Sequence, residues 1–116
     1  MDVMTKVLFL IVSGKGCEEK VNYAIISAAR MVKGKRFDEF KILLYGPAED
    51  YIVHLEGEVA ESFSFLVKEH VIDSACSAIA QKKGIDSTLS NLGVSLAPFG
   101  ERLAYFISQG YSVITF

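Results

Sequence analysis

The chain has 116 residues, a length at which one domain can bury a core without help from a metal ion or a disulfide. Hydrophobic residues make up 51% of it and charged residues 22%, a composition too apolar for a disordered segment. Twelve lysines and arginines stand against fourteen acidic residues, which excludes the basic surface typical of nucleic-acid-binding proteins. We therefore expect residues 1–116 to form a single domain that does not bind nucleic acid directly.

The first apolar run, VLFLIV at residues 7–12, is too short to span a membrane and lacks the cleavage site of a secretory signal. The cysteines, Cys17 and Cys76, lie far apart in the sequence and match no zinc-binding pattern. We expect a cytoplasmic protein, and a reducing compartment disfavours a disulfide between the two cysteines. Both should therefore be free thiols, and no metal site is predicted.

Five short apolar runs predict strands at residues 7–12, 41–46, 71–76, 93–98 and 111–116. Most of these runs are continuously apolar or β-branched and do not alternate with polar residues. This pattern is typical of strands that are covered on both faces, as in parallel sheets. Because the last run also has strand character, we expect the C-terminus to belong to the core.

Helical patterns lie between the predicted strands. The clearest covers residues 18–34, where a buried stripe is expected at Val21, Ala24, Ile25, Ala28, Ala29 and Val32. Residues 48–70 predict two short helices with a break near Gly57, whose core-facing residues are Val59, Phe63 and Leu66. One helix follows Cys76 and ends at Gly84, and another covers residues 99–109 with an apolar stripe of Leu103, Phe106 and Ile107.

Strand and helix alternate along the whole chain, and right-handed crossovers then build a mostly parallel sheet. The sequence therefore predicts a three-layer α/β/α domain with five strands and a flavodoxin-like architecture. In such folds, chemistry gathers at the carboxyl ends of the strands. The candidate residues at this edge are Ser13, Gly14, Lys15 and Cys17 after the first strand, Gly46 and Pro47 after the second, and Cys76 at the end of the third.

Cys76 is the main candidate for chemistry. A thiol between a strand end and a helix start lies near unpaired backbone N–H groups, which favour its thiolate form. If the site opens to solvent, Cys76 should be alkylated faster than Cys17, which lies in a glycine-rich loop. Free cysteines are also often buried as small hydrophobic residues. Position alone leaves both interpretations open.

The segment VIDSACSAIAQKKGIDSTLSNLGVSLAPFGERLAYFISQGYSVITF resembles the C-terminal half of DsrE-like proteins, such as DsrE, DsrF and TusD. The shared features are a strand that ends in a cysteine, here Cys76, and then Gly84-Ile85, Gly93-Val94 and Gln109-Gly110-Tyr111 in order. The N-terminal half is similar to the same family through its apolar strand, its alanine-rich helix and the sequence LLYGPA. The resemblance covers nearly the whole chain.

The resemblance implies that Cys76 accepts sulfane sulfur as a persulfide and passes it to a partner, without a cofactor. It also implies sulfur donor and acceptor proteins, a pathway of sulfur oxidation or tRNA thiolation, and a homo-oligomer such as a trimer. Asp73 and Ser74 depart from the family's more apolar strand, and no dedicated base is evident beside Cys76. The alternative is a non-catalytic subunit of the same fold that binds a small ligand or serves in assembly.

Other residue patterns are less informative. Cys17 is either a resolving thiol for Cys76 or an incidental loop residue. The loop SGKGCEEK contains Lys15 but lacks the spacing of a phosphate-binding loop. His54 and His70 have no ligand partners at metal-binding spacing. An acidic run is interpreted as a solvated face with helix N-terminal charges, and its members are Glu49, Asp50, Glu56, Glu58 and Glu61.

Two further patterns bear on function and assembly. A receiver or flavodoxin-like signalling role is disfavoured, because Ser13 and Cys76 stand where such proteins need acidic residues or a hydroxyl-rich phosphate loop. Aromatic residues such as Phe63, Phe65 and Phe99 exceed what one small core needs. This excess favours a surface covered by another copy of the chain.

Overall fold

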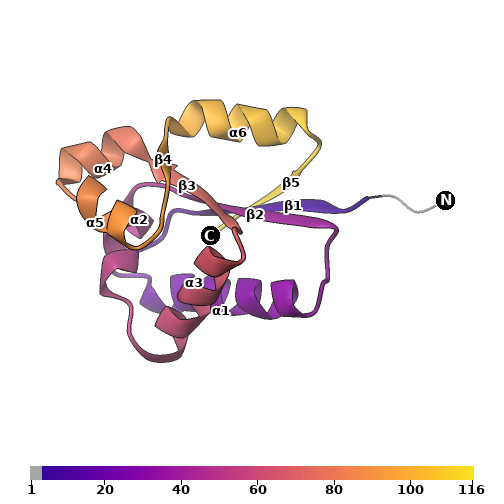
Figure 1. Cartoon of the computed structure of the whole chain (residues 1–116), viewed down its shortest axis with the longest axis horizontal. Helices are drawn as coiled ribbons and strands as arrows, with labels where there is room; N and C mark the ends of the chain where they lie inside the picture. The colour runs from indigo at the N-terminus through magenta and orange to yellow at the C-terminus, as the bar shows by residue number, and fades with distance from the viewer. Residues whose placement is uncertain (1–3) are drawn as a thin grey trace.

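A computed structural model describes residues 4–116, which form one α/β unit around a five-stranded sheet (Figure 1). Its elements in chain order are β1 (Lys6–Ile11), α1 (Glu18–Lys33), β2 (Glu39–Leu44), α2 (Pro47–Tyr51), the 3₁₀ turn η1 (Ile52–His54), α3 (Gly57–Lys68), β3 (Ile72–Cys76), α4 (Ser77–Lys83), α5 (Asp86–Asn91), β4 (Leu96–Ala97), α6 (Phe99–Ser108) and β5 (Ser112–Thr115).

All pairings in the sheet are parallel, and the strand order is β4-β3-β2-β1-β5. Helices α1 and α3 cover one face of the sheet and α6 lies on the other, while α2, α4 and α5 gather near one end (Figure 1). The predicted three-layer fold with a parallel five-stranded sheet is confirmed. No helix within residues 4–116 is long and apolar enough to cross a membrane.

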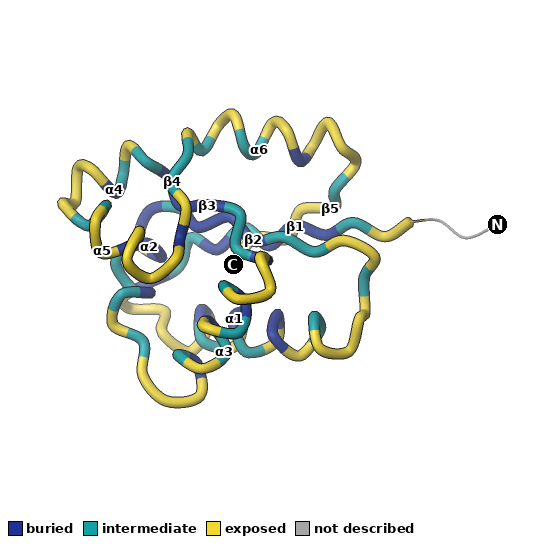
Figure 2. The backbone as a smooth tube through the Cα atoms, viewed as in Figure 1, coloured by how far each residue is buried: buried dark blue, intermediate teal, exposed yellow. Residues whose placement is uncertain are grey.

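The larger core lies between the sheet and helices α1 and α3 (Figure 2). Phe9, Ile11 and Leu44 from the strands are almost fully buried there. The stripe predicted for α1 is buried except for Val32, which is only partly covered. Several members of that stripe are alanines, which allow the helix to lie close to the sheet. Val59, Phe63 and Leu66 of α3 are buried as predicted.

A smaller core lies under α6 and consists of Leu8, Leu43 and Phe106. Leu103 is partly buried against it, whereas Ile107 is 58% exposed. The prediction that Ile107 faces the core is therefore wrong. Successive helical residues point about 100° apart, so the residue that follows Phe106 turns away from the narrow face that α6 buries.

The last strand differs from expectation, because all four residues of β5 are exposed. β5 is an edge strand that pairs only with β1, so no neighbour covers its outer side. The final residue is nevertheless anchored. The Phe116 carbonyl accepts hydrogen bonds from the N–H of Val12 at 2.7 Å and of Ser13 at 3.1 Å. Its ring also lies 4.6 Å from that of Phe9, centroid to centroid.

The polar residues inside β3 have structural partners. Arg102 of α6 donates two hydrogen bonds to the carboxylate of Asp73, from Nε at 3.0 Å and from Nη2 at 2.8 Å. Ser74 Oγ donates a third hydrogen bond to the same carboxylate, at 2.9 Å. This bidentate ion pair joins the strand that ends in Cys76 to α6, which accounts for polar side chains within an otherwise apolar strand.

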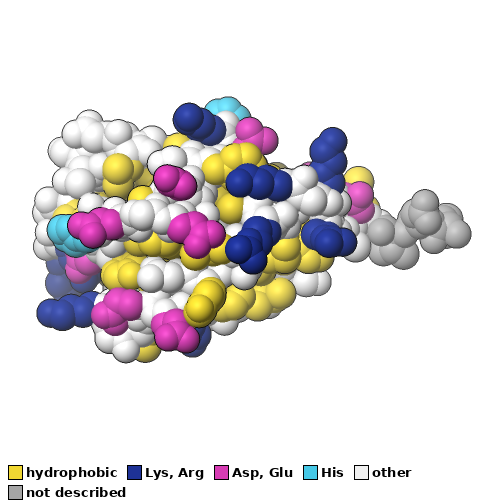
Figure 3. Space-filling model, turned by 90° about the horizontal axis from the view of Figure 1, so that it is seen from below, with side chains coloured by type: hydrophobic (Ala, Val, Ile, Leu, Met, Phe, Trp, Pro, Cys, Tyr) yellow, Lys and Arg dark blue, Asp and Glu magenta, His cyan; other side chains and the backbone are white. Residues whose placement is uncertain are grey.

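Charged side chains are distributed over the face formed by α1 and α3 (Figure 3). Lysine and arginine side chains lie mostly toward the end near the N-terminus, whereas acidic side chains lie mostly in the centre and toward the other end. Arg30 and Lys33 belong to the last turn of α1, where positive charge complements the helix dipole. Arg30 also lies 3.8 Å from the carboxylate of Glu58. This face thus carries both charges.

Candidate functional site

We call the side of the sheet at which its strands have their carboxyl ends the carboxyl edge. The loops that follow β1 and β2 pack tightly on each other there. Ala48 donates a backbone hydrogen bond to the Val12 carbonyl at 3.0 Å. Gly14 is buried against the next turn, and a Cβ at this position would lie 2.3 Å from the Pro47 carbonyl oxygen. Only glycine permits this approach, so Gly14 and Pro47 fix how the two loops meet.

Cys76 is the last residue of β3 and the N-cap residue of α4. Its strand pairs on one side with β2, where Leu44 lies opposite Ala75, and on the other with β4, where Ala97 lies opposite Cys76. The residue is only 6% exposed. Cys76 therefore lies at a strand–helix junction on the carboxyl edge, where it is buried beneath the protein surface.

Cys17 precedes α1 on the same edge and is exposed, and both cysteines are free. It borders a shallow cavity of about 530 Å³ that is also lined by Gly16, Glu18 and Tyr23, without Cys76. Accessibility therefore favours alkylation of Cys17, opposite to the order expected from the sequence. For Cys76 to react faster, the site must open.

Glu49 is the one acidic residue that the structure buries completely, with 0% exposure. The interpretation of this residue as part of a solvated acidic face is wrong. Its Oε2 accepts a hydrogen bond from the Gly46 N–H at 2.9 Å, and its own N–H donates to the Gly46 carbonyl at 2.9 Å. A glutamate at the third position of a helix caps the helix start in this way, which is the sequence signal that could have revealed it.

The environment of the Glu49 carboxyl brings it next to Cys76. Burial raises the pKa of Glu49 from 4.5 to about 7, although the backbone N–H groups of Gly46 and Cys76 and the charge of Lys83 favour the ionised form. The nearby charge of Asp50 raises it slightly further. Among the residues that the structure describes, Oε1 has no hydrogen-bond partner. A buried carboxyl that titrates near neutral pH thus lies beside the candidate cysteine.

The stability of the protein should therefore fall as pH rises through neutrality. Because the pKa of Glu49 is about 7 in the folded protein and about 4.5 when unfolded, the folded state holds the extra proton between these values. Relative to Glu49→Gln, the wild type should lose about 1–3 kcal/mol of unfolding free energy between roughly pH 5 and pH 8. Urea denaturation of both proteins at several pH values measures this. Parallel pH profiles would contradict it.

A cavity of about 580 Å³ lies on the carboxyl edge beside α2 and α4. Lys15, Asp50 and Lys83 contribute its charged groups, and Lys83 forms an ion pair with Asp50. The other residues that line it are Pro47, Tyr51, Val53, His54 and Ile85. Lys15 and Pro47, both expected in a pocket from the sequence, thus meet here, whereas Cys76 is not part of the lining.

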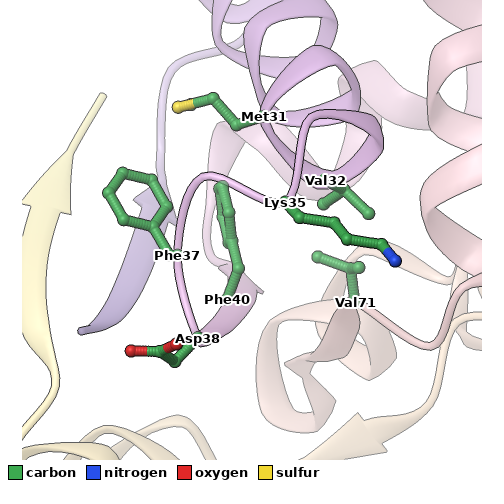
Figure 4. Close-up of a pocket in the computed structure, with 7 residues that line it drawn as sticks. All are labelled: Met31, Val32, Lys35, Phe37, Asp38, Phe40 and Val71. Carbon is green, nitrogen blue, oxygen red and sulfur yellow. The ribbon is translucent and has the colours of Figure 1, made fainter. Parts of the chain in front are cut away.

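Another cavity, of about 390 Å³, lies at the opposite end of the sheet, near the C-terminal end of α1 (Figure 4). Most of its lining residues are apolar, and the two charged ones, Lys35 and Asp38, extend in different directions (Figure 4). Asp38 is held locally, because its Oδ2 accepts a hydrogen bond from the Thr5 N–H at 2.7 Å. This cavity lacks convergent polar groups and lies far from the cysteines.

Within residues 4–116, no three His, Cys, Asp or Glu side chains are grouped closely enough to hold a metal ion. His54 lines the cavity beside α2, whereas the His70 carbonyl accepts a hydrogen bond from Lys41 Nζ at 2.7 Å. The two histidines therefore lie on separate elements.

Solved structures share this fold over almost the entire chain. A conserved protein of unknown function from Bacteroides thetaiotaomicron, BT1422, is 16% identical, with a TM-score of 0.79 over 99% of this chain and 100% of that one. The YchN protein of E. coli is 18% identical, with a TM-score of 0.69 over 97% and 100%. MTH1491 of Methanobacterium thermoautotrophicum, also of unknown function, is 19% identical, with a TM-score of 0.68 over 96% and 98%.

No protein-family model matches the sequence, and no curated protein matches it. At identities below one fifth, the structural matches show the fold alone. They assign no activity, partner or residue role to this chain, because one fold can serve many functions.

Proposed function

We propose that this chain is a DsrE-like sulfur carrier, in which Cys76 accepts a sulfane sulfur as a persulfide and passes it to a partner protein. The observation that carries the proposal is the position of Cys76 at the carboxyl end of β3, as the N-cap residue of α4. The sequence resemblance to DsrE-like proteins implies that the sulfur-carrying cysteine lies at such a junction. The structural matches support the proposal only through the fold that they share.

The chemistry requires little from the protein. A thiolate attacks the outer sulfur of a donor persulfide, and the donor leaves as a thiolate. Backbone N–H groups at the start of a helix favour the negative charge of the attacking sulfur. Low exposure, 6% for Cys76, would shield a bound persulfide from water and reductants. The same burial requires the carboxyl edge to open when a donor or acceptor docks.

Intact-mass spectrometry after incubation with a low-molecular-weight persulfide tests the proposal. After a mild thiol wash that removes sulfur from the exposed Cys17, the wild type should keep the mass of one sulfur atom and Cys76→Ser should keep none. Cys17→Ser is the matched control and should load like the wild type, because Cys17 lies outside the proposed site. Loading of Cys76→Ser to the wild-type extent would contradict the carrier function of Cys76.

A second function, a non-catalytic subunit that binds a small ligand, is favoured by the cavity of about 580 Å³ beside α2 and α4. The cavity combines apolar walls with Lys15, Asp50 and Lys83, yet Cys76 is not part of its lining. The loading experiment separates the two functions. If the chain is a binding subunit, Cys76 takes up no sulfur. Replacing Lys83, which lines the cavity, by alanine should then abolish binding of the small ligand.

We also propose that the chain forms a homo-oligomer, with a trimer as the state implied by the family resemblance. Large apolar side chains are exposed on neighbouring parts of α6 and β5, and these are Tyr105, Ile107, Val113 and Ile114. Light scattering at micromolar concentration should give a multiple of 12.8 kDa for the wild type. Ile107→Lys should reduce the oligomer fraction. A wild type that remains at the monomer mass would overturn this expectation.

A further inference from the structure

The strands and turns around Cys76 bring a single buried carboxyl to it. β2 and β3 are neighbours, with Leu44 opposite Ala75, so the chain leaves β2 beside the end of β3. The turn at Gly46 then starts α2, a helix that packs against α4. Glu49 is the first acidic residue of α2, and its carboxyl faces the backbone N–H of Cys76.

The two oxygens of this carboxyl have different surroundings. Oε2 is occupied by the hydrogen bond from the Gly46 N–H at 2.9 Å. Oε1 is buried and has no hydrogen-bond partner in the part of the chain that the structure describes. Buried polar atoms without a partner are rare in proteins, and a catalytic role is one of the reasons for which they are kept. The same carboxyl also lies close enough to the backbone N–H of Cys76 for that group to favour its ionised form.

We propose that Glu49 accepts the proton of the Cys76 thiol during sulfur loading and then gives it to the departing donor. This inference rests on the proposed carrier function and adds the base that the sequence did not reveal. The donor is a persulfide of the form R–S–SH, as in the proposed carrier function.

The step balances without an added oxidant or reductant. Glu49 carboxylate takes the thiol proton and leaves a Cys76 thiolate. The thiolate attacks the outer sulfur of R–S–SH, a new S–S bond forms at Cys76, and the old S–S bond breaks with its electron pair on R–S⁻. Protonated Glu49 then gives its proton to R–S⁻. The products are R–SH, the Cys76 persulfide and the original carboxylate.

A carboxyl is suited to this exchange when it changes protonation near the working pH. Burial raises the pKa of Glu49 to about 7, so both forms are present at neutral pH. The charges that act on it are Asp50 on its own helix and Lys83 on α4. Lys15 in the loop after β1 and His54 in η1 line the same cavity as those two residues. Lys83 is already paired with Asp50, which leaves Glu49 as the unpaired carboxyl beside residue Cys76.

The test measures sulfur loading by glutathione persulfide and alkylation of Cys76 by iodoacetamide from pH 5 to pH 9, in a Cys17→Ser background. Both rates should rise through about pH 7 in the parent protein. Glu49→Gln, which keeps the size and an acceptor for the Gly46 N–H, should load about 100-fold more slowly and lose this rise, as expected when general base catalysis is removed. It should still reach one sulfur per chain. Glu58→Gln, at an exposed position of α3, is the charge-matched control and should behave like the parent.

Each outcome decides one of the two ideas. Equal loading rates and pH profiles for parent and Glu49→Gln would overturn the role of Glu49 and leave the carrier function intact. If no variant takes up sulfur, the carrier function fails, and the alkylation profiles still decide whether Glu49 controls the thiol. If Glu49→Gln does not fold, the alkylation of Cys76 in the parent protein tests the proposal by itself. An alkylation rate that rises only at alkaline pH, as for an isolated thiol, would overturn the proposal.

Discussion

Replacing Phe106 by alanine should destabilise the protein by about 3–5 kcal/mol, a large part of the 5–15 kcal/mol typical of a folded domain. Phe106 is 2% exposed and is the only buried residue of α6. Together with Leu8 and Leu43 it forms the whole buried centre of the smaller core. No other side chain on the helix can replace its contacts, so the cavity left by the ring should remain.

Urea denaturation followed by circular dichroism measures this loss. Ile107→Ala is the matched control, because it removes a large apolar side chain from the next position of the same helix. Ile107 is 58% exposed, so its removal should change the free energy of unfolding by less than about 0.5 kcal/mol when both variants are measured at a concentration low enough to keep the chain monomeric. Similar losses for the two variants would show that α6 is not held by Phe106.

Replacing Gly14 by alanine should cost about 3 kcal/mol, the upper end of the range for overpacking a buried site. The added Cβ would lie 2.3 Å from the carbonyl oxygen and 2.7 Å from the carbonyl carbon of Pro47. Both are backbone atoms, so no side-chain rotation can relieve the clash. The loops after β1 and β2 must separate, and α2 with Glu49 must move with Pro47.

Gly100→Ala provides the comparison for this variant. A Cβ at Gly100 meets no atom within 4 Å, and the residue lies in α6. Alanine is a better helix former than glycine, so this variant should be unchanged or up to about 1 kcal/mol more stable. Thermal unfolding of both variants checks the contrast. A Gly14→Ala protein as stable as Gly100→Ala would mean that the loop contact is loose.

The fold could be predicted from the sequence because its strands are short apolar runs and its helices carry regular stripes. The runs at residues 7–12 and 71–76 became β1 and β3 with small shifts at their ends. Strand order could not be read in the same way. The run at 111–116 is as apolar as the others, but its exposure follows from its place at the sheet edge, which local composition does not encode.

The site was only partly predictable. A cysteine after a strand can be located from the pattern alone, and Cys76 lies at such a junction. The sequence pattern predicts a solvent-exposed Glu49, because acidic residues near a helix start are usually exposed. Its burial depends on how the Gly46 turn packs beside β3, a contact between segments that are distant in the sequence. The preceding Gly-Pro and the capping position were the available local signals.

The edge position of β5 also limits which symmetry an assembly can use. The other edge strand, β4, has only two residues and offers little backbone for pairing, so a sheet could continue from one chain to the next only at β5. Two identical edge strands that pair with each other do so about a twofold axis, which gives a dimer. A threefold ring instead needs a head-to-tail contact, in which the exposed apolar side chains of α6 and β5 meet a different surface of the next copy.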